Sequence, residues 1–140
     1  AYLDSQRISV SRVAQVGDSL CSTGFPSRKR HHNINVHFFY QLAMVSHGVR
    51  RGGSAALDLA YVAAGRLDGF WEFGLKSWDM AAGLLLVEEA GGRISDMQGG
   101  AASISGEHIF ASNGLLHSEI LELFGGIFAG RVPTPMPTLP

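Results

Sequence analysis

Apolar residues recur at helical spacing in four segments of the chain. Between residues 34 and 47 they follow the repeat of one helix face, and Gly48 is a suitable end for that helix. Residues 54–64 contain no glycine or proline and are rich in alanine and leucine, which are strong helix formers. Two further helices are expected over residues 80–90, where a pair of glycines follows, and over residues 115–128.

Shorter segments alternate or cluster apolar residues in the manner of strands: 7–10, 20–23, 49–51, 67–73, 93–96 and 108–111. Helices that alternate with strands predict one layered α/β domain over residues 1–130, with helices flanking a mixed β-sheet. The last segment, residues 131–140, holds four of the five prolines. We expect it to be an extended, disordered tail.

The composition narrows the class of protein. A chain of 140 residues suits one domain, and 46% hydrophobic against 16% charged residues excludes intrinsic disorder. The formal net charge of −1 leaves no basic surplus for a phosphate backbone, so nucleic acid is not an expected partner. A single cysteine, Cys21, excludes an internal disulfide framework and indicates a small buried side chain.

The hydropathy of the chain also bears on its location. No apolar run reaches the length of a membrane span, and the first ten residues are too polar for a signal peptide. The sequence therefore predicts a cytoplasmic protein without a membrane partner.

The turn Gly53-Ser54-Ala55 is the first candidate for chemistry. A glycine turn leads there into a helix, with Ser54 as the N-cap and Gly65 as the end. Free N–H groups at such a helix start favour an anion or an electron-rich hydroxyl, and small side chains let a ligand approach the backbone. The alternative is an ordinary capped helix.

Two acidic residues follow this turn in the sequence. Asp79 opens the helix expected over residues 80–90, where it is either a plain N-cap or a rigid ligand for Mg²⁺. Glu72 closes a strand of aromatic residues, where it is either a binding group or a solvated charge at the strand end.

Other polar clusters carry less weight. His31, His32 and His37 have a spacing that resembles a metal site, but they stand beside the basic run 28–30 and before a helix. We interpret them as solvated histidines and the basic run as a solvated loop.

The candidate residues belong to blocks that together resemble a known family. The blocks are Gly53-Ser54-Ala55-Ala56-Leu57-Asp58, Trp78-Asp79-Met80-Ala81-Ala82-Gly83 and Glu89-Ala90-Gly91-Gly92. In this order they are similar to the C-terminal half of inositol monophosphatases, and residues 57–66 resemble the bacterial branch. The resemblance runs from Ala1 to about Phe128.

The resemblance implies a fold and an activity. Members are sugar-phosphatase-fold enzymes that hydrolyse small phosphate monoesters with two or three Mg²⁺ ions. By this resemblance Asp79 is a metal ligand, Glu72 binds a substrate hydroxyl, and Gly53, Ser54 and Ala55 lie against the inositol ring. Trp78 is expected to fix Asp79 by packing. Ser77 departs from the proline that many bacterial members carry there, which loosens this turn.

The other half of such an enzyme has no counterpart in these residues. The family's N-terminal half supplies a glutamate pair and an Asp-Pro-Ile-Asp-Gly-Thr motif, which hold most of the metal ligands, and that motif does not occur here. Because Asp79 and Glu72 alone are too few to hold two Mg²⁺ ions, we expect half of an active site that is inactive by itself.

The resemblance leaves the substrate and the working unit open. Myo-inositol 1-phosphate is favoured by the bacterial features, and a nucleotide-type 3′-phosphate or fructose bisphosphate is an alternative. The chain is expected to form a homodimer. A second hypothesis is a non-catalytic module for dimerisation or regulation, because the apolar run 84–87 needs cover on more than one side of its helix.

Overall fold

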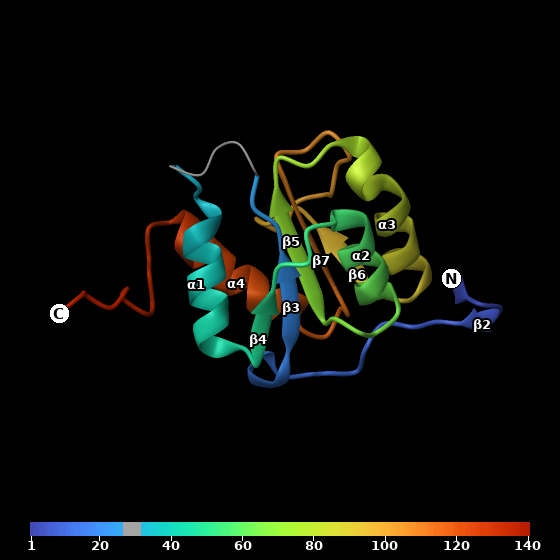
Figure 1. Cartoon of the computed structure of the whole chain (residues 1–140), viewed down its shortest axis with the longest axis horizontal. Coiled ribbons are helices and arrows are strands. Elements are labelled where there is room, and N and C mark those ends of the chain that lie inside the picture. The colour runs from blue at the N-terminus through green and yellow to red at the C-terminus, as the bar shows by residue number, and fades with distance from the viewer. Residues whose placement is uncertain (27–31) are drawn as a thin grey trace.

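The structure is a computed structural model and describes residues 1–26 and 32–140 (Figure 1). The basic run 28–30 and His31 lie outside the described residues, whereas His32 and His37 are exposed. The elements in chain order are β1 (Tyr2–Leu3), β2 (Gln6–Arg7), η1 (Val16–Asp18), β3 (Leu20–Thr23), α1 (Asn35–Val45), β4 (Gly48–Arg50), α2 (Ala55–Ala63), β5 (Gly69–Phe73), α3 (Ser77–Glu89), β6 (Arg93–Ser95), β7 (His108–Ser112) and α4 (His117–Phe128).

The main sheet is mixed, as the sequence predicts. Its five strands have the order β4-β3-β5-β7-β6. Strand β3 is parallel to both of its neighbours, β4 and β5, while β7 runs antiparallel to β5 and β6. Because β3, β4 and β5 are parallel, their carboxyl ends meet at one end of the sheet.

Helices cover both faces of this sheet, with α1 and α4 on one face and α2 and α3 on the other (Figure 1). Side chains alternate between the faces along each strand. Trp71 therefore packs with Phe38 and Phe124 on the α1–α4 face, and its neighbour Phe70 packs with Leu59 on the α2–α3 face. The two apolar cores hold the sheet between two helical layers.

The strand predicted over residues 7–10 is wrong in extent. Only Gln6–Arg7 is extended in a ladder, and it pairs with Tyr2–Leu3 in a hairpin separate from the main sheet. The turn at Asp4 and Ser5 has positive φ angles of 47° and 65°, which folds the chain back at once and leaves a two-residue ladder. The Val10 N–H instead donates to the Ala90 carbonyl.

Residues 131–140 form neither helix nor strand, and part of this segment is bound to α1. Gln41 Nε2 donates to the Thr134 carbonyl over 2.6 Å, and the Thr134 N–H donates to Gln41 Oε1 over 3.0 Å. The Tyr40 hydroxyl donates to the Pro135 carbonyl. Among the helices of the described segments, none has both the length and the apolar character required to cross a membrane.

Candidate active site at the carboxyl ends of three parallel strands

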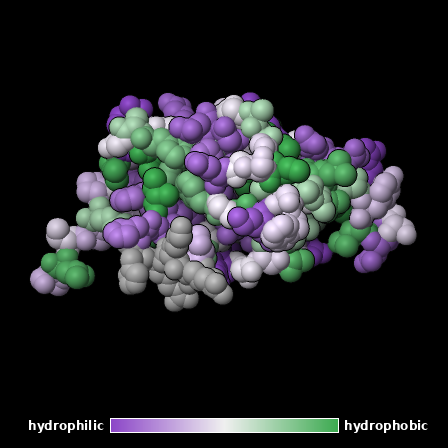
Figure 2. All heavy atoms as spheres, turned by 90° about the horizontal axis from the view of Figure 1, so that it is seen from above, coloured by the Kyte–Doolittle hydropathy of each residue, from purple (hydrophilic) through white to green (hydrophobic). Residues whose placement is uncertain are grey.

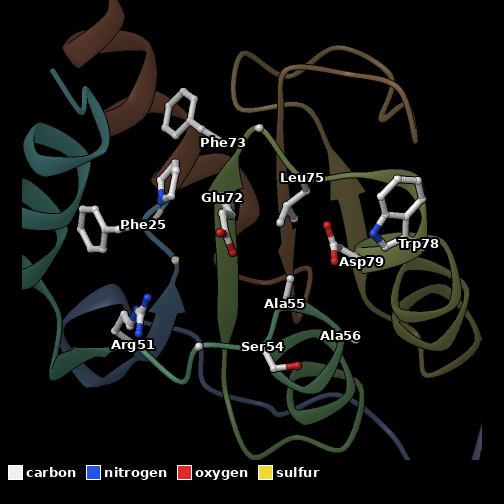
Figure 3. Close-up of a pocket in the computed structure, with 14 residues that line it drawn as sticks. Phe25, Arg51, Ser54, Ala55, Ala56, Glu72, Phe73, Leu75, Trp78 and Asp79 are labelled. Atoms are coloured by element: carbon white, nitrogen blue, oxygen red, sulfur yellow. The ribbon is translucent and has the colours of Figure 1, made fainter. Parts of the chain in front are cut away.

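A cavity of about 500 Å³ lies where β3, β4 and β5 end (Figure 3). The helices that follow β3 and β4 lie on opposite faces of the sheet, and such a reversal opens a crevice at the carboxyl ends of parallel strands. The surface around this end mixes hydrophilic and hydrophobic residues (Figure 2). The lining comes from the ends of the three strands, the start of α2 and the first turn of α3: Gly24, Phe25, Pro26, Arg51, Gly53, Ser54, Ala55, Ala56, Glu72, Phe73, Gly74, Leu75, Trp78 and Asp79.

All five residues that the sequence indicates for binding line this one cavity: Gly53, Ser54, Ala55, Glu72 and Asp79. Figure 3 shows Arg51 and Phe25 on one side of it and Asp79 with Trp78 on the other, with Glu72 between them. Residues that are far apart in the sequence are thus brought together because each stands at the end of a parallel strand or at the start of the next helix.

The start of α2 has the local structure that the sequence predicts. Gly53 has a φ of +89°, a conformation that favours glycine, and it turns the chain from β4 into the helix. Ser54 is the N-cap, and its side-chain oxygen accepts from the Leu57 N–H over 3.4 Å. Other N–H groups of the first helical turn have no partner within the helix, so they can bind an electron-rich ligand group.

Asp79 lies two residues inside its helix rather than at its start. The helix begins at Ser77 with Lys76 as N-cap, and Asp79 Oδ2 accepts from the Lys76 N–H over 2.9 Å. Trp78 is 79% exposed, and its role in fixing Asp79 by packing stays a prediction. The hydrogen bond back to Lys76 orients the carboxylate.

Glu72 is the most perturbed acid of the cavity. The pKa of its carboxyl is raised to about 7, first by burial and then by the nearby charges of Asp58 and Asp79, while Arg51 opposes the rise. No described residue hydrogen-bonds to this carboxylate. The side chain lies against Gly24, where an added Cβ would clash with Glu72 Oε2, so glycine leaves room for the carboxylate in this position.

Two charged residues near Glu72 were missed as site residues. Asp58 is only 4% exposed, and burial raises its pKa while Arg51 opposes that rise. Its position four residues after the N-cap Ser54 is the signal, because that spacing returns to the same helix face. Arg51 is exposed, lines the cavity and places its Nη1 about 3.5 Å from where a Cβ on Gly53 would stand.

The donor atoms suit a hard divalent cation in kind but not in number. Carboxylate oxygens such as those of Asp79 are the ligands that Mg²⁺ prefers. Within residues 1–26 and 32–140, no group of three or more His, Cys, Asp or Glu side chains could hold a metal ion.

The remaining candidate, Cys21, has no role in this site. Its thiol is fully buried in the α1–α4 core, and burial raises its pKa to about 12. The interpretation of Cys21 as a small buried side chain is confirmed.

Comparison with known proteins decides the family. The model of the inositol monophosphatase family matches residues 1–127. The chain belongs to this family. The inositol-1-monophosphatase of Mesorhizobium japonicum is 47% identical over 124 residues, which are 87% of this chain and 46% of that protein. The Nus factor SuhB of Pseudomonas aeruginosa is 48% identical over 116 residues, 81% of this chain and 43% of that protein.

Solved structures of inositol monophosphatases share the fold. The structure of the inositol monophosphatase from Anabaena has a TM-score of 0.80 and 42% identity, covering 84% of this chain and 47% of that one. The Thermotoga maritima enzyme gives a TM-score of 0.81 at 33% identity. The chain thus spans just under half the length of the relatives and structures that it matches.

Proposed function

We propose that this chain supplies the polyol-binding side of a Mg²⁺-dependent phosphatase site, within a longer enzyme that hydrolyses a small phosphate monoester. The observation that carries the proposal is the convergence of the Gly53–Ala55 turn, Glu72 and Asp79 on one cavity. A volume of about 500 Å³ suits a ligand of the size of a sugar phosphate. Myo-inositol 1-phosphate is the favoured substrate, since relatives bear the name inositol-1-monophosphatase.

The roles of the residues follow from their chemistry. The ionised Glu72 carboxylate accepts hydrogen bonds from ring hydroxyls, and the first N–H groups of α2 bind ring oxygens. Asp79 is one ligand of Mg²⁺, which when bound would activate water and neutralise charge on the phosphate. Because Asp79 and Glu72 alone would be too few to hold two such ions, the remaining ligands must come from outside this chain.

A titration of the 140-residue chain tests this proposal. We expect myo-inositol 1-phosphate with Mg²⁺ to shift the amide NMR signals of Gly53, Ser54, Ala55 and Glu72, with weak affinity and without release of phosphate. Glu72→Gln should weaken the interaction at least about threefold, since a charge-assisted hydrogen bond is lost. A matched control is Glu88→Gln on the exposed end of α3, which should change nothing. Shifts confined to other surfaces would contradict the proposal.

A second candidate function rests on an exposed apolar surface. Leu57 and Tyr61 on α2 are 57% and 40% exposed, and Trp78 and Leu85 on α3 are 79% and 60% exposed. These helices pack on each other, and each pair stands at a spacing that returns to one helix face. We propose this surface for association, either in a homodimer or with a regulatory partner, and relatives named Nus factor SuhB agree with a regulatory role.

Sedimentation velocity of the isolated chain separates these outcomes. Self-association that Leu57→Lys and Leu85→Lys abolish supports a dimer through this surface. A monomer at all concentrations would contradict the dimer.

A cytoplasmic location remains a prediction.

A further inference from the structure

A closed network of hydrogen bonds lies in the protein interior directly beneath the wall of the cavity. Its centre is Asn35, the first residue of α1, which is 0% exposed. Asn35 Nδ2 donates to Thr23 Oγ1 over 2.9 Å and to the Gly24 carbonyl over 2.8 Å. Its Oδ1 accepts from Trp71 Nε1 over 2.6 Å. Both amide protons and the oxygen of one side chain are therefore hydrogen-bonded to β3, to the residue after it, and to the neighbouring strand β5.

The network joins the end of β3 to the middle of β5. Thr23 and Trp71 are register partners in the sheet, and the Thr23 hydroxyl also donates to the Trp71 carbonyl over 2.6 Å. Since that hydroxyl donates to the carbonyl, its lone pairs are free to accept from Asn35. The buried Asn35 amide is thus hydrogen-bonded to Thr23 on β3 and to Trp71 on β5.

The next residue along each strand is a cavity residue. Gly24 follows Thr23, and Glu72 follows Trp71. Because side chains alternate along β5, Trp71 points to the network and Glu72 points to the cavity. The Glu72 carboxylate lies against Gly24, where an added Cβ would clash with Oε2. The bonds of Asn35 to the Gly24 carbonyl and to Trp71 therefore set both sides of this contact.

We propose that Asn35 is a positioning residue for Glu72, holding Gly24 and Trp71 so that the Glu72 carboxylate stays pressed against the cavity wall. The network itself is independent of the proposed function, and only the consequence for ligand binding rests on it. Asn35 touches no ligand in this proposal, because it lies on the opposite face of the sheet from the carboxylate.

A second buried asparagine provides a matched control. Asn113 is 4% exposed, its Nδ2 donates to Ser11 Oγ and the Val13 carbonyl, and its Oδ1 accepts from the Leu115 and Leu116 N–H groups. It is as fully bonded as Asn35, but it follows β7 rather than leading into the cavity. A purely structural role predicts the same behaviour for both asparagines.

The experiment measures the titration of the Glu72 carboxyl carbon by NMR in the 140-residue chain. We expect Asn35→Ala to shift the midpoint of this titration towards the ordinary glutamate value by about one pH unit, because the carboxylate gains access to water. Asn113→Ala should leave the midpoint unchanged, even where the melting temperature falls as much. The Trp71 indole N–H signal should move in Asn35→Ala alone.

A milder variant covers the case in which Asn35→Ala does not fold. Thr23→Val keeps the side-chain shape and the strand preference while removing one acceptor and the donor to Trp71. It should shift the Glu72 midpoint in the same direction by a smaller amount. An unchanged midpoint in the folded variants, or an equal shift in Asn113→Ala, would overturn the inference.

Affinity for myo-inositol 1-phosphate, used as the probe with Mg²⁺, separates this inference from the proposed function. Asn35→Ala should weaken binding about as much as Glu72→Gln, and the double variant should be no weaker than Glu72→Gln alone. If Asn35→Ala moves the Glu72 titration but Glu72→Gln leaves affinity unchanged, the positioning stands and the polyol role of Glu72 fails.

Discussion

Glu72 and His117 are both titratable side chains held within the sheet and its helices, yet their surroundings differ. His117 Nε2 and Nδ1 lie 2.9 Å from the hydroxyls of Ser95 and Ser112, and its ring stacks on Phe110 with centroids 4.5 Å apart. Glu72 has no hydrogen-bond partner among the described residues and faces a cavity. Both ring nitrogens of the buried histidine are hydrogen-bonded, whereas the carboxylate of Glu72 faces the cavity and can bind a ligand there.

The bonding around His117 also defines its protonation. The Ser95 hydroxyl donates to the Asp96 carbonyl, so it accepts a hydrogen bond from the His117 Nε2–H, and Nδ1 accepts a hydrogen bond from the Ser112 hydroxyl. Burial, and secondarily the charge of Arg93, lowers the pKa of His117 to about 4, so the ring is neutral near pH 7. For Glu72, burial and neighbouring carboxylates raise the pKa to about 7. The comparison teaches that burial alone does not mark a functional group, whereas burial without a partner beside a cavity does.

Removing the histidine should have the largest effect. His117→Ala leaves a void under Phe110 and two serine hydroxyls without their partner, so we expect the free energy of unfolding to fall by about 3 kcal/mol. Urea denaturation at pH 7 measures this loss. A loss below about 1 kcal/mol would show that the network contributes little.

Replacing Glu72 should raise the free energy of unfolding, whereas replacing His117 should lower it. The carboxyl has a higher pKa in the folded chain than its ordinary value of 4.5, so stability falls as pH rises from 4.5 to about 7. Glu72→Gln removes this loss of stability with rising pH, because glutamine does not ionise. Because the carboxyl is only half-buried and solvent screens it, we expect a gain of about 1–2 kcal/mol at pH 8 and almost none at pH 4.

Denaturation of both proteins at the two pH values checks this expectation. A glutamine variant that is less stable than the parent at pH 8 would show that the Glu72 carboxylate is stabilised by partners in the fold. The contrast with His117 would then disappear.

Filling the space beside Glu72 should give a smaller effect. In Gly24→Ala the new methyl group would meet the Glu72 carboxylate, which must swing away into the cavity. We expect about 1 kcal/mol of lost stability and a Glu72 pKa closer to its ordinary value. Carboxyl NMR measures the second effect. Gly74→Ala is the variant without crowding, because no atom lies within 4 Å of the added Cβ at Gly74. The positive φ of Gly74 adds a backbone strain that Gly24→Ala does not have.

The smallest expected effect is at the start of α2. Ser54→Ala removes the N-cap hydrogen bond, and because this bond is long at 3.4 Å we expect a loss of about 0.5–1 kcal/mol. Thermal unfolding measures it, with Ser118→Ala at an exposed position of α4 as the control. A loss above about 2 kcal/mol would mean that Ser54 supports more than the helix.

Local signals in the sequence were sufficient for much of the fold and for part of the site. Ser54 and Gly65 determine the ends of α2 by their own conformations, so that helix is readable from its residues. Lys76 carries no capping side-chain oxygen, and therefore the sequence predicts the start of α3 three residues late, at Met80 with Asp79 as the N-cap. The family resemblance identified the blocks that converge on the cavity, and their convergence required the parallel strands.

Tertiary contacts account for what the sequence could not show. Asn35 bonds to Trp71, which is 36 residues away, so its neighbours in the chain give no sign of its partners. The raised pKa of Glu72 depends first on burial and then on Asp58 and Asp79, which come from two different helices. The exposure of Trp78 depends on what packs on α3, which no local pattern determines.

The central claim is that this chain is the polyol-binding half of an active site completed by a second half. The most direct test joins residues 1–140 to the part of Mesorhizobium japonicum inositol-1-monophosphatase that lies outside the match, and measures phosphate release from myo-inositol 1-phosphate with Mg²⁺. The account predicts turnover by the chimera, none by the 140-residue chain, and at least a hundredfold loss, as an order-of-magnitude estimate, in the chimera with Asp79→Asn. Turnover by the chain alone at the rate of the chimera, or none by a folded chimera, would contradict it.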